Sequence, residues 1–98
     1  MSPASPESRP LRRKIPWRRL EEEAVVLDVK KGVLYPLNAV GARVWDLCDG
    51  DRSADAIAET IVAEFDADPD AIRRDVRAFI ADLAQAGLVT LESEGGRA

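Results

Sequence analysis

Val25, Leu27 and Val29 alternate with Val26 and Asp28, and this period of two is typical of a half-buried strand. Lys30-Lys31-Gly32 supplies a short turn, and Val33–Leu37 is predicted as the return strand of a hairpin. Pro36 has no main-chain N–H, so it cannot lie in a strand that is hydrogen-bonded on both sides. The return strand is therefore predicted at an edge of the sheet, or with its last residue outside the ladder.

The chain before the hairpin divides into two parts. Residues 1–14 are rich in proline, serine and arginine and have no periodic apolar positions, so they are predicted to form a disordered basic arm. Ile15 to Leu20 is predicted as a short first strand or extended lead-in anchored by Trp17, followed by an exposed turn or strand start over Glu21-Glu22-Glu23. With a frayed tail expected at 93–98, residues 15–92 form a single predicted domain.

Three helices are predicted after the hairpin, each with a start signal. Asn38 is a good N-cap for a helix from Ala39 to Cys48, and Ser53 caps a second helix. Asp68, followed by Pro69 and Asp70, is the clearest start, for a third helix that runs to Ala86. Gly87 stops that helix, and Leu88 to Leu91 is predicted to return to the core as a short strand or extended tail.

Two residues of the first helix have chemistry to consider. Trp45 lies one position off the apolar stripe of Val40, Val44 and Leu47, so it is expected to be partly exposed. Cys48 lies near that stripe and is predicted to be a buried, inert thiol.

Strands followed by helices indicate the α+β class. The predicted fold is a small three-stranded antiparallel sheet followed by a three-helix bundle, similar to a winged helix-turn-helix.

Composition argues against catalysis. The chain has no histidine and one cysteine, which excludes an imidazole base, an internal disulfide and the usual zinc ligand sets. Ser53 and Ser93 have no base to activate them, and no glycine-rich phosphate loop follows a strand. We therefore expect no catalytic residue, no metal and no cofactor. No apolar run is long enough to span a bilayer, so a cytoplasmic protein without a membrane partner is expected.

Charge leaves a nucleic-acid alternative open. Six of the seven charged residues in 1–19 are basic, whereas the remaining chain is acidic. In a winged helix the third helix would enter a DNA groove, but here Arg73, Arg74 and Arg77 are balanced by Asp70, Asp75 and Asp82. An acidic body would be repelled by phosphates, so binding of nucleic acid is the weaker alternative.

The exposed edge strand favours peptide binding. A partner segment could pair with Val33–Leu37, and the trough between that strand and a helix would hold its side chains. On physical grounds the N-terminal arm or Leu88 to Leu91 could cover the edge equally well. A homodimer formed through the same edge would compete with peptide.

The order and spacing of several short motifs point to a family. They are Tyr35-Pro36-Leu37-Asn38 with Gly41 and Trp45, the Asp49-Gly50 turn, and Gly87-Leu88-Val89. Over about residues 15–92 the chain resembles the PqqD-like family, the recognition elements of ribosomally synthesised and post-translationally modified peptides.

The resemblance implies a non-catalytic adaptor. Such a module captures the leader of a precursor peptide as an added strand, beside the third strand and against the third helix, and presents it to a modifying enzyme, such as a radical enzyme, or to a leader peptidase. The positions that match the peptide-binding residues are Val33, Leu34, Tyr35, Pro36 and Leu37 on the strand and Arg74, Asp75, Arg77, Ala78 and Phe79 on the helix.

One motif departs from part of the family. Members that serve pyrroloquinoline quinone biosynthesis carry a proline-glutamate pair near the end of the third strand, where this chain has Tyr35-Pro36-Leu37-Asn38. This form resembles stand-alone members that serve lasso-peptide or other modification clusters.

Overall fold

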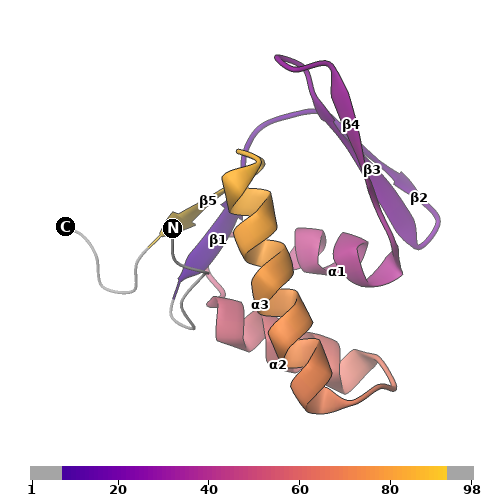
Figure 1. Ribbon diagram of the computed structural model, residues 1–98, viewed down its shortest axis with the longest axis vertical. Coiled ribbons are helices and arrows are strands. Elements are labelled where there is room, and N and C mark those ends of the chain that lie inside the picture. The colour runs from indigo at the N-terminus through magenta and orange to yellow at the C-terminus, as the bar shows by residue number, and fades with distance from the viewer. Residues whose placement is uncertain (1–7, 93–98) are drawn as a thin grey trace.

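The computed structural model describes residues 8–92. Its elements are β1 (Arg9–Arg12), β2 (Trp17–Leu20), β3 (Glu23–Asp28), β4 (Val33–Leu37), α1 (Ala39–Leu47), α2 (Ala54–Glu64), α3 (Pro69–Gln85) and β5 (Val89–Glu92). Figure 1 shows α3 running along the front of the molecule, with the sheet that contains β3 and β4 rising beside it. The predicted α+β class, with a three-stranded antiparallel sheet followed by three helices, is confirmed.

The three-stranded sheet has the order β2-β3-β4, so β4 lies at an edge. β3 and β4 pair antiparallel, with Val25 opposite Pro36 and Leu27 opposite Leu34. Gly32, in the turn between them, has a φ of 66°, a left-handed conformation that a residue without a Cβ adopts at little cost. The predicted hairpin and its edge position are both confirmed.

The three predicted helix caps are also present. The Asn38 side chain accepts a hydrogen bond from Gly41 N at 2.8 Å, and the Ser53 hydroxyl accepts one from Ala56 N at 3.0 Å. The Asp68 carboxylate accepts one from Ala71 N at 3.1 Å. Each bond satisfies one of the main-chain donors that a first helical turn leaves free, which is why the helices begin where they do.

The core lies where the helices meet the inner face of the sheet. α3 contributes Val76, Ile80 and Leu83, which recur at intervals of three and four residues and are buried. They join a single cluster with buried residues of the sheet and the other helices: Ala24, Val26, Leu37, Ala42, Val44, Trp45, Leu47, Cys48, Ala54, Ile57, Ala58, Ile61, Leu88 and Val89. Burying each large aliphatic side chain stabilises the fold by roughly 1.5–3 kcal/mol.

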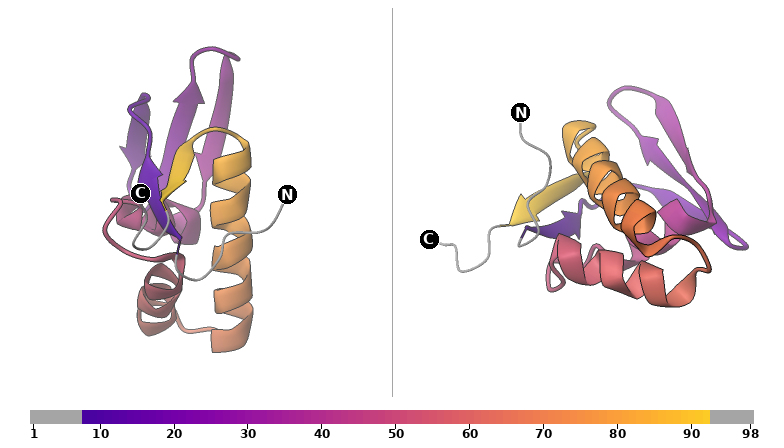
Figure 2. Two further views of the ribbon diagram at one scale, coloured as in Figure 1. Left: turned by 90° about the vertical axis from the view of Figure 1, so that its left-hand side faces the viewer. Right: turned by 60° about the horizontal axis from the view of Figure 1, so that its bottom comes forward.

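The expectation of a disordered arm over residues 1–14 is wrong for β1. This strand pairs antiparallel with β5, forming a second, two-stranded sheet that lies apart from the first (Figures 1 and 2). On its other side Arg12 N donates to Cys48 O at 2.9 Å, and Gly50 N donates to Pro10 O at 2.9 Å. Main-chain bonds to two distant segments therefore hold a stretch that has few apolar side chains. Residues 1–7 and the predicted frayed tail at 93–98 lie outside the described residues.

The expectation that Trp45 is partly exposed is also wrong, because its side chain is fully buried. Trp17 of β2 packs edge-on against it, with ring centroids 6.1 Å apart. The Arg12 guanidinium reaches over the same region and donates to Trp45 O and Asp46 O. The segment from β1 to β2 thus covers the side of α1 that would otherwise face solvent.

Candidate functional site

The outer edge of β4 is unpaired in the part of the chain that the structure describes. Pro36 lies within the ladder opposite Val25 yet has no N–H, so its nitrogen must face the open edge. The N–H and C=O of one strand residue point to the same side and alternate along the strand, so Leu34 also turns its main-chain groups outward. The open edge therefore offers one donor, Leu34 N–H, and two acceptors, the carbonyls of Leu34 and Pro36.

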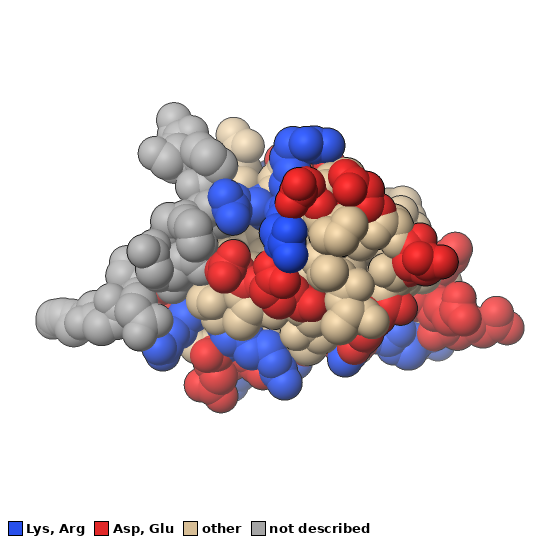
Figure 3. All heavy atoms as spheres, turned by 90° about the horizontal axis from the view of Figure 1, so that it is seen from below, with Lys and Arg blue, Asp and Glu red and all other residues tan. Residues whose placement is uncertain are grey.

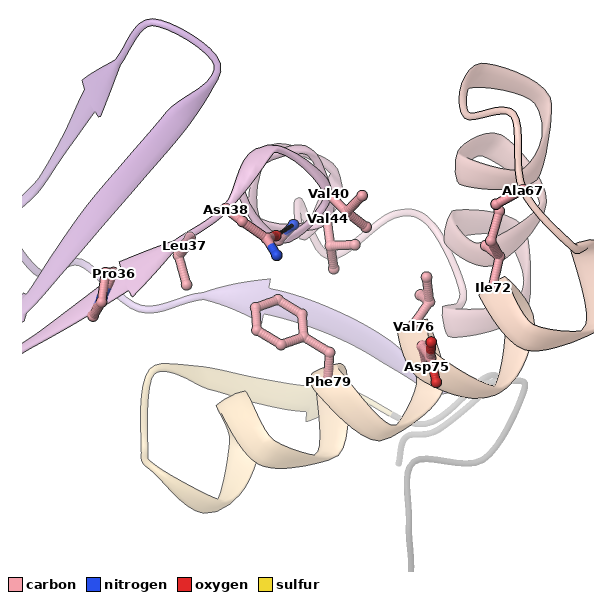
Figure 4. Close-up of a pocket in the computed structure, with 11 residues that line it drawn as sticks. Pro36, Leu37, Asn38, Val40, Val44, Ala67, Ile72, Asp75, Val76 and Phe79 are labelled. Atoms are coloured by element: carbon pink, nitrogen blue, oxygen red, sulfur yellow. Dashed lines mark hydrogen bonds between the residues drawn. The ribbon is translucent and has the colours of Figure 1, made fainter.

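A cleft of about 490 Å³ lies between β4, α1 and α3. Figure 4 shows its side chains: Val40 and Val44 of α1 face Phe79 and Val76 of α3 across the opening. The residues that line it are Pro36, Leu37, Asn38, Val40, Gly41, Val44, Ala67, Ile72, Asp75, Val76 and Phe79. An apolar trough thus runs directly beside free main-chain groups.

Phe79 forms part of the cleft wall, and its position depends on a residue without a side chain. Gly41 allows the ring to approach α1, since a Cβ there would lie 3.2 Å from Phe79 Cζ. The ring is half-buried and packs against the core cluster, leaving one surface open to the cleft.

Four of the ten residues predicted to bind peptide line this cleft: Pro36, Leu37, Asp75 and Phe79. The other three strand residues lie on β4 outside the cleft. Val33 and Leu34 are exposed, with Leu34 on the outer face of the sheet beside Leu27, and Tyr35 packs against the core.

The remaining three predicted residues, Arg74, Arg77 and Ala78, do not line the cleft. Arg74 and Ala78 are exposed on α3. Arg77 points toward α2, where its guanidinium lies 4.0 Å from the Asp55 carboxylate.

Sequence reasoning missed most of the apolar wall, including Val40, Gly41, Val44, Ile72 and Val76. The valines and Ile72 recur at helical spacing, so their sequence pattern does not distinguish the cleft wall from the core. Gly41 was the available signal, because a glycine early in a helix costs stability unless another group must come close.

Two of the three basic residues of α3, Arg73 and Arg77, pair with carboxylates of α2, and Arg74 is exposed. Arg73 Nε donates to Glu59 Oε2 at 2.6 Å, and this pair lowers the pKa of Glu59. Acidic and basic side chains are interspersed on the end of the molecule that carries the α2–α3 loop (Figure 3). A DNA-reading helix needs a uniformly basic, accessible surface, so this arrangement argues against the winged-helix alternative.

The described residues offer neither a reactive thiol nor a metal-binding cluster. Cys48 is fully buried, its thiol donates to Val44 O at 3.2 Å, and burial raises its pKa to about 12. A neutral, inaccessible thiol is a poor nucleophile. Within residues 8–92, no group of three or more histidine, cysteine or acidic side chains could hold a metal ion.

None of the helices within residues 8–92 is both long enough and apolar enough to cross a membrane.

Comparison with known proteins gives one family match. Residues 23–89 match the model of the family described as Coenzyme PQQ synthesis protein D (PqqD). The matched stretch contains the hairpin, all three helices and the start of β5.

Full-length relatives and a solved structure are also similar. The chain is 34% identical over 88 residues to the PqqA binding protein of Rhodopseudomonas palustris (strain HaA2), covering 88% of this chain and 85% of the relative. It is 32% identical over 90 residues to the PqqA binding protein of Bradyrhizobium diazoefficiens, covering 92% and 85% respectively. The structure of TbiB1 in complex with the TbiA(beta) leader peptide superposes with a TM-score of 0.72 at 27% identity, covering 86% of this chain and 99% of the other.

Proposed function

The chain belongs to the Coenzyme PQQ synthesis protein D family, and we propose that it is a non-catalytic adaptor that binds the leader segment of a ribosomal precursor peptide. The leader adds as a fourth strand beside β4 and packs against α3. In this position its main chain pairs with Leu34 and Pro36, and alternate side chains enter the cleft.

One observation carries the proposal: the open edge of β4 lies directly beside an apolar cleft walled by α1 and α3. An unpaired edge strand alone promotes aggregation, so proteins usually cover it or place charged residues on it. Here the exposed main chain and the cleft together meet both needs of an extended peptide, which are backbone pairing and pockets for alternate side chains. The similar solved structure, TbiB1, holds a leader peptide, and the relatives are named for binding PqqA.

The bound leader is presented to a separate protein in the cytoplasm, either a radical modifying enzyme or a leader peptidase. We further propose that the pathway is of the lasso-peptide or another modification type, because Tyr35-Pro36-Leu37-Asn38 lacks the proline-glutamate pair expected for quinone-cofactor members. The PqqA binding relatives point to the alternative pathway. Parallel titrations with PqqA and with a synthetic lasso-peptide leader distinguish the two.

Amide hydrogen exchange followed by NMR tests the binding mode. In the free protein Leu34 N–H is exposed at the edge and should exchange fast, whereas Tyr35 N–H is bonded to β3 and should be protected. Addition of a synthetic lasso-peptide leader or of PqqA should protect Leu34 and shift the resonances of Phe79 and Val40. If saturating leader and PqqA both leave Leu34 unprotected, the strand-addition proposal is wrong.

A further inference from the structure

A second cleft lies at the opposite end of β4. It has a volume of about 560 Å³ and lies between the β3–β4 turn, the segment that follows β1, and the C-terminal end of α3. In Figure 1 the β3–β4 turn and the C-terminal end of α3 both lie in the upper part of the molecule. No residue of β4 lines this cleft, but Lys30 and Lys31 of the turn do, and the turn leads into β4, so a strand added to β4 that extends past Val33 would end near these lysines.

The second cleft is basic. Among the described residues that line it, Arg13, Lys14, Lys30 and Lys31 are cationic and Asp28 is the only acid. Asp28 Oδ1 already accepts a hydrogen bond from Lys31 N at 3.2 Å, and Arg13 donates to Gly87 O at 3.4 Å. The ammonium groups of the three lysines have no partner within residues 8–92, so their charge is available to a ligand.

The first cleft, in contrast, carries a negative charge. Asp75 alone is charged among the described residues that line it, and its carboxylate forms no hydrogen bond or ion pair within residues 8–92. Of its basic neighbours on α3, Arg73 and Arg77 pair with carboxylates of α2, and the exposed Arg74 does not line the cleft. An unpaired carboxylate at an apolar opening favours a cationic group on whatever binds there.

We propose, on the basis of the proposed function, that this adaptor selects a leader with opposite charges at the two ends of an apolar stretch. A Lys or Arg of the leader lies beside Asp75, and an Asp or Glu lies beside Lys30 and Lys31. Charge thereby sets the register of the added strand.

The direction follows from strand chemistry. Antiparallel pairing is more common and slightly more stable than parallel pairing, so the leader runs opposite to β4. Its N-terminal part then lies near Leu37 and Asp75, and its C-terminal part lies near Val33 and the lysines. β4 has five residues, and its ends are roughly 14 Å apart at about 3.4 Å per residue. The basic residue should therefore precede the acidic one by about four to six positions.

A random peptide display library selected against the full chain provides the ligand for the test. The selected peptide is synthesised in two forms of identical composition, one with its basic residue first and one with the basic and acidic residues exchanged. Identical composition removes any effect of net charge or apolar content. We expect the basic-first form to bind about tenfold more tightly at low salt. Each surface ion pair raises its affinity a few-fold, and the acidic-first form is weakened further because like charges meet at both ends.

Protein variants test the residues. Asp75→Lys combined with Lys30→Glu and Lys31→Glu should reverse the preference between the two peptides. Asp51→Lys and Arg18→Glu change exposed charges away from both clefts and should leave the preference unchanged. Equal affinity of both peptides, tighter binding of the acidic-first form, or an unaltered preference in the triple variant would overturn the inference.

The same experiment separates this inference from the proposed function. Protection of Leu34 N–H by the selected peptide reports strand addition whatever the charge order. If the peptide protects Leu34 without a charge preference, only the present inference fails. If no selected peptide protects Leu34, strand addition itself fails.

Discussion

The ring of Phe79 on α3 lies against Gly41 on α1, where a Cβ would come within 3.2 Å of its Cζ. The same Cβ would lie 3.3 Å from Asn38 Oδ1, the atom that caps α1. At the wall of the cleft α1 therefore contributes no side chain at Gly41, and the Phe79 ring of α3 packs directly against its main chain. The missing side chain sets where the Phe79 ring sits, and therefore how wide the cleft is.

Gly41→Ala should narrow the cleft with little change in stability. Alanine gains about 1 kcal/mol of helix propensity over glycine, and the close contact with a half-buried ring costs a similar amount. The unfolding free energy should therefore change by less than about 1 kcal/mol, while leader affinity falls several-fold as Phe79 moves into the opening.

Urea unfolding and peptide titration measure these two effects. Phe79→Ala serves as the control background: in it, Gly41→Ala should lose most of its effect on affinity, because the ring that it displaces is absent. An effect of equal size in both backgrounds would mean that Gly41 does not act through Phe79.

Leu34→Pro should weaken leader binding without a comparable loss of stability. The substitution removes the one main-chain donor that faces the open edge and no hydrogen bond to β3. Tyr35→Pro removes a ladder bond to β3 and should destabilise the protein more strongly. Isothermal titration measures the leader affinity of each variant. Leu34→Ala is the control, because it loses the leucine side chain but keeps the N–H. Equal leader affinity of Leu34→Pro and Leu34→Ala would show that this donor is not used.

Arg12→Ala should destabilise the protein by about 1–2 kcal/mol. The guanidinium of Arg12 donates to Asp46 O at 2.9 Å and to Trp45 O at 3.0 Å, and Trp45 O also accepts from Cys48 N at 3.2 Å at the end of α1. Arg18 is exposed on β2, so Arg18→Ala should change the unfolding free energy by less than about 0.5 kcal/mol. Thermal or urea unfolding that gives the two variants equal stability would contradict the role of β1 as part of the fold.

Stability should fall above about pH 9 because of Cys48. Burial raises the pKa of its thiol from 9.0 to about 12 in the folded protein, so the unfolded chain releases this proton first. Below pH 9 the thiol is protonated in both states, and Cys48 contributes its full stabilisation. As the pH rises from 9 toward 12, the unfolded chain loses the proton while the folded protein keeps it, so the free energy of unfolding falls. In Cys48→Ala this part of the pH dependence should be absent. Urea unfolding between pH 7 and 11 measures the free energy of unfolding at each pH. If it changes with pH equally in the native protein and in Cys48→Ala, Cys48 is not the cause.

The sequence by itself determined the elements whose cause is local. Pro36 lacks a donor, which places β4 at an edge without reference to any other part of the chain. Asn38, Ser53 and Asp68 each accept a hydrogen bond from an amide three residues later, so the helix starts are set by neighbouring residues. The edge strand and the helix beside it were predictable for this reason.

Only the tertiary structure decided which side of each element faces which neighbour. β1 forms through main-chain bonds to β5 and to the loop after α1. Because these partners are distant in sequence, the four residues of β1 do not by themselves predict a strand. The rotation of α3 against α2 turns Arg77 toward Asp55 and leaves Asp75 and Phe79 at the cleft. That rotation is set by how all the buried side chains pack at once, and the pattern of one helix does not contain this information.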